Sequence, residues 1–161
     1  MAADLENTLY LDVPAGRVVI ELRPDLAPEH CAHIKALARN GFYDGIVFHR
    51  VIAGLMAQTG DPTGTGTGGS GRRLKAEFSA EPHVRGTLSM ARASDPDSAD
   101  SQFFIVFDDA GFLDGQYTVW GRVESGMEHV DAIKKGDSAR NGTVANPDKI
   151  VKMQVAADAA D

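Results

Sequence analysis

The chain has 161 residues, of which 43% are hydrophobic, so it is long enough to bury one core and too short for two ordinary domains. Its formal net charge of -7 at pH 7 gives no broad cationic surface for phosphates or anionic lipid headgroups, so neither nucleic acid nor a membrane is an expected partner. The single cysteine, Cys31, excludes an intramolecular disulfide, and the N-terminus lacks the basic start and apolar run of a signal peptide. We therefore expect a cytoplasmic protein.

The N-terminal part of the chain predicts a β-hairpin followed by a helix. Apolar and polar residues alternate over Thr8–Val13 and again over Arg17–Arg23, and Pro14–Gly16 between them is a turn sequence. Pro28–Asn40 starts with a proline, ends before a glycine and repeats its apolar residues at helical spacing. This segment is expected to lie as an amphipathic helix on an apolar surface.

The rest of the chain predicts mostly short strands. Six further runs of apolar or alternating residues are bounded mainly by Gly, Pro, Asp or Ser, and we expect strands at Val47–Ile52, Met56–Thr59, Thr87–Ala91, Gln102–Phe107, Thr118–Val123 and Ile150–Val155. A second helix is expected over Met127–Lys135, between two glycines. Eight strands and two helices indicate one mainly β domain spanning residues 1–161, a barrel with covered ends. Its ordered core should span about 7–156, with a frayed C-terminal tail.

One strand carries an arginine among apolar residues. Strand alternation places Phe48, Arg50 and Ile52 on one face. Taken alone, this pattern fits a functional arginine and a structural arginine at a barrel rim equally well. In the second case the aliphatic part of the side chain packs on the protein and the guanidinium lies in water. Met56 and Gln58 share a face of the next strand, after a tight turn, so antiparallel pairing brings Gln58 beside Arg50.

The strand Gln102–Phe107 has large apolar side chains on both faces. One face can fill the barrel, and the other needs a different cover. Gln102 and Phe104, an amide and an aromatic ring on the outward face, suit a pocket that grips an apolar ring and hydrogen-bonds an extended peptide. Alternatively, the outward face of this strand is covered by a second buried layer of side chains, which explains the same pattern without a pocket.

Several segments in order resemble signatures of one known family, the cyclophilins: Phe48-His49-Arg50-Val51, Met56-Ala57-Gln58-Thr59-Gly60-Asp61, Gly66-Thr67-Gly68-Gly69, Leu88-Ser89-Met90-Ala91 and Ser101-Gln102-Phe103-Phe104-Ile105. The pattern continues in Leu113-Asp114-Gly115 and Trp120-Gly121-Arg122-Val123, and the likeness runs from about Thr8 to Val155. The chain thus resembles a bacterial-like, single-domain cyclophilin-type peptidyl-prolyl cis/trans isomerase.

This resemblance implies a closed, eight-stranded antiparallel β-barrel capped by two α-helices, with a proline pocket on its outer surface. The implied activity is rotation about X-Pro peptide bonds, which assists protein folding and needs neither cofactor nor metal. Arg50 would be the catalytic residue, oriented by Gln58. The implied substrate-binding residues are Phe48, Leu55, Met56, Ala91, Arg92, Ala93, Gln102, Phe104, Phe112, Leu113 and Tyr117. Partners would be proline-containing, unfolded or partly folded polypeptides, bound by a monomer.

The sequence departs from many cyclophilins at four pocket positions. They carry tryptophan where this chain has Phe112, asparagine at Arg92, phenylalanine at Leu55 and histidine at Tyr117. The loss of an indole N–H at Phe112 removes a donor that the family uses toward cyclosporin, so we expect weak binding of that drug. A proline-peptide binding module or chaperone with little turnover is the alternative function, against which Arg50, Gln58 and Phe104 argue.

Three other sequence features could indicate nucleotide binding, metal binding or serine hydrolysis, but each fits that function poorly. Gly66–Gly71 fits the letters of a dinucleotide loop but lies in no βαβ unit, which favours a flexible surface loop. His30 and His33 are read as exposed helix residues rather than metal ligands. Ser89 and Ser101 lie in no nucleophile elbow, and no motif places a His/Asp pair beside either serine.

Overall fold

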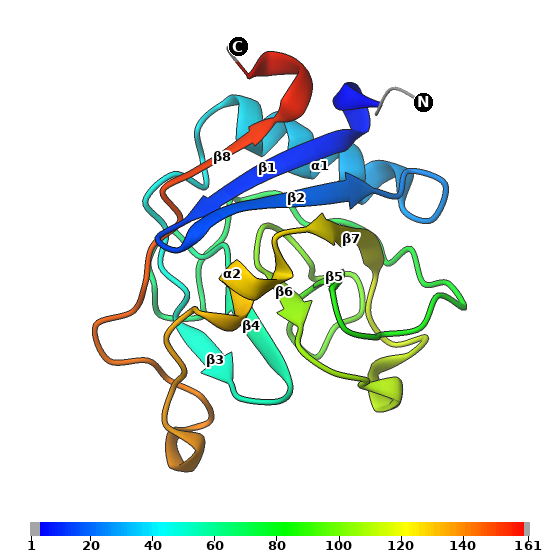
Figure 1. Ribbon diagram of the computed structural model, residues 1–161. Helices are drawn as coiled ribbons and strands as arrows, with labels where there is room; N and C mark the ends of the chain where they lie inside the picture. Colours follow the sequence, from blue (N-terminus) through cyan, green and yellow to red (C-terminus); the bar gives the residue numbers. More distant parts are fainter. Residues whose placement is uncertain (1–3, 160–161) are drawn as a thin grey trace.

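The computed structural model describes residues 4–159 as one strongly curled antiparallel sheet with two helices (Figure 1). The strands are β1 (Thr8–Val13), β2 (Gly16–Leu22), β3 (Arg50–Ile52), β4 (Met56–Thr59), β5 (Thr87–Met90), β6 (Phe103–Val106), β7 (Val119–Ser125) and β8 (Lys152–Val155). The helices are α1 (Pro28–Arg39) and α2 (Met127–Asp131), with short 3-10 turns η1 (Leu5–Asn7), η2 (Gly111–Leu113), η3 (Ser138–Arg140) and η4 (Ala156–Asp158). Among these residues, none of the helices has the length and apolar content that a membrane span requires.

The sheet order is β3-β4-β6-β5-β7-β2-β1-β8, so β3 and β8 are its two ends. The gap between them is bridged just outside these strands, where Phe48 N–H donates to Asp148 O at 2.8 Å and Ile150 N–H donates to Ile46 O at 2.8 Å. The predicted mainly β, antiparallel, two-helix fold is confirmed. The sheet is not the fully closed barrel that was expected, because β3 and β8 themselves do not pair.

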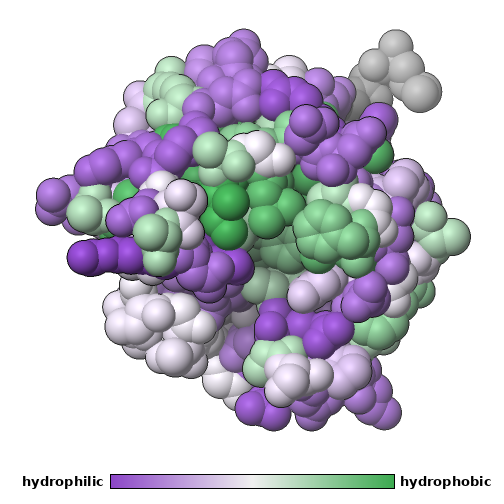
Figure 2. All heavy atoms as spheres, turned by 90° about the horizontal axis from the view of Figure 1, so that it is seen from below, coloured by the Kyte–Doolittle hydropathy of each residue, from purple (hydrophilic) through white to green (hydrophobic). Residues whose placement is uncertain are grey.

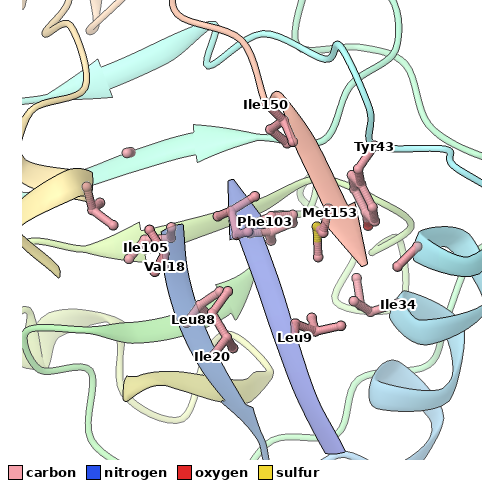
Figure 3. Packing of buried hydrophobic residues seen from close by; sticks show 14 of the residues in the cluster. Leu9, Val18, Ile20, Ile34, Tyr43, Leu88, Phe103, Ile105, Ile150 and Met153 are labelled. Carbon is pink, nitrogen blue, oxygen red and sulfur yellow. The ribbon is translucent and has the colours of Figure 1, made fainter. Parts of the chain in front are cut away.

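The concave side of the sheet holds the main hydrophobic core (Figure 3). Leu9 and Leu11 of β1 and Ile20 of β2 point inward and are fully buried, as their alternation with polar neighbours predicts. Helix α1 packs against β8 and buries Ile34 of its apolar face in the same core. Phe103 of β6 lies at the centre, edge-on to Trp120 with ring centroids 5.3 Å apart.

A second, smaller apolar cluster lies on the opposite side of the same strands. Its buried members are Met56, Phe104, Val106 and Ala110, and partly buried side chains surround them: Ile52, Leu55, Ala91, Leu113 and Tyr117. Phe103 and Phe104 are neighbours in β6 and therefore face opposite sides of the sheet. The outward apolar face of β6 is thus covered by residues from four other segments, and this cluster forms the base of the site described below.

Both α1 histidines are buried, so the prediction of exposed residues is wrong. His30 is 0% exposed, and its Nδ1 lies 2.5 Å from Glu77 Oε1. His33 Nε2 lies 3.3 Å from Ser70 Oγ and 3.5 Å from Asp100 Oδ1. The reason is that residues 70–77 cross this face of α1, which the sequence periodicity of a helix cannot show. Within residues 4–159, no three His, Cys, Asp or Glu side chains are grouped to hold a metal ion.

Element boundaries differ most from prediction at α2 and β3. Helix α2 ends at Asp131 rather than Lys135, and Lys135 Nζ instead donates to the Asp131 and Ile133 carbonyls, which closes the helix end. β3 begins only at Arg50. At the C-terminus, η4 follows β8 directly and Asp158 pairs with Arg39 at 2.8 Å; residues 160–161 lie outside the described range.

Candidate active site

An apolar pocket of about 280 Å³ opens over the second cluster. Figure 2, which views the molecule from below Figure 1, shows an apolar depression bordered by hydrophilic residues on this side. The residues that line the pocket come from β3, β4, β6 and the loops after β5 and around η2: Arg50, Leu55, Met56, Gln58, Ala91, Arg92, Phe104, Phe112, Leu113 and Tyr117. The structure therefore brings together most of the predicted site residues.

The floor of the pocket is the Phe104 ring. Phe104 is only 5% exposed, and the Tyr117 ring meets it edge-on at 5.7 Å. Phe112 lies at the other extreme, 67% exposed. The pocket thus has a fixed aromatic floor and one loosely held wall, and it suits a small, rigid apolar group.

A polar chain runs along one side of the pocket. Arg50 and Gln58 are direct partners in the β3–β4 register, and Arg50 Nη1–H donates to Gln58 Oε1 at 3.1 Å. Gln58 Nε2 donates to Gln102 Oε1 at 3.0 Å, and Gln102 Nε2 donates to the Gly66 and Gly68 carbonyls, both at 3.0 Å. The predicted neighbourhood of Arg50 and Gln58 is present, and the amide orientations follow from this chain of donors.

Asn141 also contacts Arg50, although no sequence motif predicts this contact. Arg50 Nε–H donates to Asn141 O at 2.9 Å, and Nη2–H donates to Asn141 Oδ1 at 3.0 Å. The Asn141-Gly142 dipeptide signals a turn, but this contact joins residues 91 positions apart. Such long-range pairing leaves no local sequence signal.

A second cavity of about 400 Å³ adjoins the apolar pocket. The two share Gln58, Ala91 and Arg92, and the second is also lined by Ala93 and Gln102. Together they form one continuous groove. All predicted substrate-binding residues except Phe48 line one of the two.

Arg92 joins two loops that border the groove. Its Nε–H and Nη2–H donate to Gln116 O at 3.0 and 2.8 Å, and Nη1–H donates to Ala93 O at 3.0 Å. Its guanidinium also lies 4.8 Å from the centre of the Tyr117 ring. The Arg92 side chain, and not only its backbone, therefore contributes to the architecture of the site.

Phe48 does not line the pocket, which corrects the expectation. It is 0% exposed and belongs to the main core, together with Val51. The residues before Arg50 are not in regular strand conformation, so side-chain alternation is lost at His49. Phe48 and Val51 therefore face the same side although they are three residues apart. Strand alternation would place His49 on the opposite face from Arg50, but both residues line one cavity of about 360 Å³.

Behind the pocket floor, Ser89, His83 and Asp114 are hydrogen-bonded in a row, although no motif places a His/Asp pair there. His83 Nδ1 lies 3.0 Å from Asp114 Oδ1, and Nε2 lies 2.9 Å from Ser89 Oγ. Burial lowers the pKa of His83, against the raising effect of Asp114, and the Ser89 hydroxyl donates to Thr118 O at 3.0 Å. Ser89 is 0% exposed beneath Phe104, where no substrate carbonyl can reach it. The row is therefore structural and anchors the η2 loop.

The sequence pattern of the cyclophilin type peptidyl-prolyl cis-trans isomerase/CLD family matches residues 8–155. This chain belongs to the cyclophilin family. A probable peptidyl-prolyl cis-trans isomerase of Brucella suis is 58% identical to this cyclophilin over 169 residues, covering 98% of this chain and 86% of the relative.

Solved structures agree with this assignment. A cyclophilin from Hirschia baltica matches with a TM-score of 0.88 at 28% identity, covering 99% of this chain and 77% of that one. A Cryptosporidium parvum cyclophilin type isomerase, solved in the presence of the dipeptide Ala-Pro, matches with a TM-score of 0.85 at 31% identity, covering 92% of this chain and 98% of that one. The predicted family, fold and isomerase class are confirmed, and this cyclophilin is a peptidyl-prolyl cis-trans isomerase.

Proposed function

We propose that the apolar pocket holds the proline ring of an X-Pro segment while Arg50 donates a hydrogen bond to the prolyl nitrogen as the peptide bond rotates. The observation that carries this proposal is the position of the Arg50 guanidinium at the edge of a pocket whose floor is Phe104. That the related Cryptosporidium isomerase was solved in the presence of the dipeptide Ala-Pro supports the same ligand chemistry.

The reaction needs no bond to the enzyme. The barrier to rotation is about 18–20 kcal/mol because amide resonance must be broken. In the twisted transition state the prolyl nitrogen regains a lone pair, which can accept a hydrogen bond that the planar ground state cannot. A donor placed there binds the transition state more tightly than the substrate, which accelerates the reaction. Arginine suits this role because it stays charged throughout the neutral pH range.

One hydrogen bond does not account for a large rate enhancement. A 10⁵-fold acceleration corresponds to roughly 7 kcal/mol, and one preorganised donor supplies about 3–4 kcal/mol. The remainder must come from the pocket, which removes the proline ring from water and fixes one side of the bond while the other turns. Met56 and Phe104, both almost fully buried, provide rigid surface for that purpose.

Hydrogen bonds within the protein leave only some backbone groups of the groove free for a substrate. Ala91 N–H already donates to Gln102 O at 3.0 Å, and Ala93 N–H donates to Ser98 Oγ at 2.9 Å. We therefore assign substrate hydrogen bonds to the Arg92 N–H and to the carbonyls of Ala91 and Arg92. Gln58 orients Arg50 in this scheme, and Gln102 contacts the extended chain.

The physiological role that we propose is the folding of proline-containing, unfolded or partly folded polypeptides, by a monomer in the cytoplasm. Gel filtration with light scattering tests the monomer, and fractionation of the source cells tests the location. Cyclosporin should bind weakly, because Phe112 offers no N–H donor. A nanomolar dissociation constant in calorimetry contradicts that expectation.

The decisive experiment compares the wild type with Arg50→Ala. Protease-coupled kinetics and NMR exchange on an Ala-Pro test peptide should show a loss of about 10²-fold or more in kcat/KM, on the scale of removing one preorganised donor. Urea midpoints establish that both proteins are equally folded. Unchanged rates remove Arg50 from the mechanism. A wild type that binds the peptide without turnover favours a binding module or chaperone instead.

A further inference from the structure

The Arg50 guanidinium is held by three neutral oxygens. Of its five N–H bonds, one on Nε donates to Asn141 O, one on Nη2 to Asn141 Oδ1 and one on Nη1 to Gln58 Oε1, at 2.9, 3.0 and 3.1 Å. One N–H on each terminal nitrogen remains for a substrate. Because the three acceptors are uncharged, they fix the direction of the guanidinium without neutralising its charge.

Asn141 supplies two of these acceptors from one residue, and its backbone conformation makes this possible. Asn141 has φ 58° and ψ 32°, in the left-handed region that asparagine tolerates better than most residues. In this conformation both its carbonyl and its side-chain amide oxygen reach the same guanidinium. A residue in extended or right-handed conformation at this place would present its carbonyl elsewhere.

The turn that carries Asn141 is tied to the backbone on both sides of Arg50. Val51 N–H donates to Gly142 O at 2.8 Å, and Val144 N–H donates to His49 O at 3.1 Å. A Cβ atom on Gly142 would lie 2.5 Å from Ile52 Cγ1, so the turn sits tightly against β3. The position of Asn141 relative to the Arg50 backbone is therefore fixed.

We propose that Asn141 is a positioning residue for prolyl isomerisation, which holds the Arg50 guanidinium in its productive direction and leaves its full charge for the prolyl nitrogen. This inference rests on the proposed role of Arg50. Preorganised donors outperform mobile ones because their orientation is fixed before the reaction begins. Gln58 alone contacts only Nη1 and would leave the guanidinium free to swing about that contact.

Two substitutions separate the contributions of Asn141. Asn141→Gly keeps the left-handed backbone and its carbonyl but removes Oδ1. Asn141→Asp keeps the shape and both acceptors but places a negative charge against the guanidinium. A matched control is Asn146→Gly, because Asn146 is also exposed and left-handed, with φ 51°, and lies outside the cavities that Arg50 lines.

We expect Asn141→Gly to lower kcat by about 10- to 100-fold, on the scale of one hydrogen bond to a charged group, with KM nearly unchanged. Asn141→Asp should lower kcat at least as much despite its intact geometry, because an ion pair competes with the prolyl nitrogen for the guanidinium. Asn146→Gly should match the wild type. All variants are compared on the Ala-Pro peptide, with urea midpoints as the measure of folding.

Arg50→Ala is measured in the same series so that two failures can be told apart. If Arg50→Ala loses activity while both Asn141 variants keep kcat within twofold of the wild type, the role of Asn141 is refuted and that of Arg50 stands. If Arg50→Ala keeps its activity, the proposed function of Arg50 is refuted, and the role of Asn141, which rests on it, is refuted as well. A loss in Asn141→Gly that Asn146→Gly shares, or that follows the urea midpoints, assigns Asn141 a structural role and overturns the inference.

Discussion

Replacing Gln58 by leucine tests whether the polar chain beside the pocket acts on catalysis rather than on stability. The change removes the acceptor for Arg50 Nη1 and the donor to Gln102, at 3.1 and 3.0 Å, while preserving the approximate size of the side chain. Gln58 is half-buried, so water can reach the groups that lose their partner. We therefore expect the free energy of unfolding to fall by only about 1 kcal/mol.

The effect of this substitution on catalysis should be larger. The guanidinium loses one of three acceptors, and a hydrogen bond to a charged group contributes about 1.5–3 kcal/mol. At about 1.4 kcal/mol per factor of ten, kcat/KM should fall by about 10- to 100-fold. NMR exchange on an Ala-Pro peptide measures this without the coupling protease.

The matched control is Gln154→Leu, which makes the same replacement at a half-buried position of β8, away from the pocket. It should leave kcat/KM unchanged. If Gln58→Leu stays within twofold of the wild type, Arg50 does not need Gln58 for its orientation and the reasoning from the hydrogen-bond chain is wrong. If both leucine variants lose activity equally, the loss is a general effect of the substitution.

Three further outcomes are expected. Phe112→Trp should strengthen cyclosporin binding by about tenfold, since it adds one hydrogen-bond donor at the pocket mouth, and calorimetry that shows no change would remove this position from drug recognition. Arg92→Gln should raise KM several-fold with a smaller effect on kcat, because it loosens the Gln116 loop; steady-state kinetics that show only a kcat effect would contradict this. Burial lowers the pKa values of His30 and His83 in the folded protein, so the unfolded chain binds more protons below about pH 6.5, and urea midpoints should fall from pH 7.5 to 5.5 rather than rise.

The sequence predicts the fold well where one face of a strand is buried. β1 and β4 have the predicted bounds, because alternation and flanking turn residues define them locally. The prediction fails for Phe48, because the chain before Arg50 leaves regular strand geometry and Phe48 turns into the main core with Val51. Local patterns record which residues are apolar but not where the backbone leaves the strand.

The sequence predicts those site residues that lie on paired strands or in a motif similar to the cyclophilin signatures. Gln58 lies beside Arg50 because consecutive antiparallel strands pair, which the sequence shows. The sequence does not predict the contact of Asn141 with Arg50 or that of Glu77 with His30, because each contact joins segments that are far apart in the chain. The tertiary arrangement alone decides them.

The two apolar clusters on opposite sides of β4 and β6 have a consequence for how this protein can change. Phe103 contributes to the main core and Phe104 to the apolar pocket, although they are consecutive residues of one strand. Substitutions at outward positions can therefore reshape the pocket without opening a cavity in the main core, and inward substitutions can adjust stability without changing the pocket. A laboratory selection for new peptide preferences should accumulate changes at every second residue of these strands and leave the intervening positions as they are.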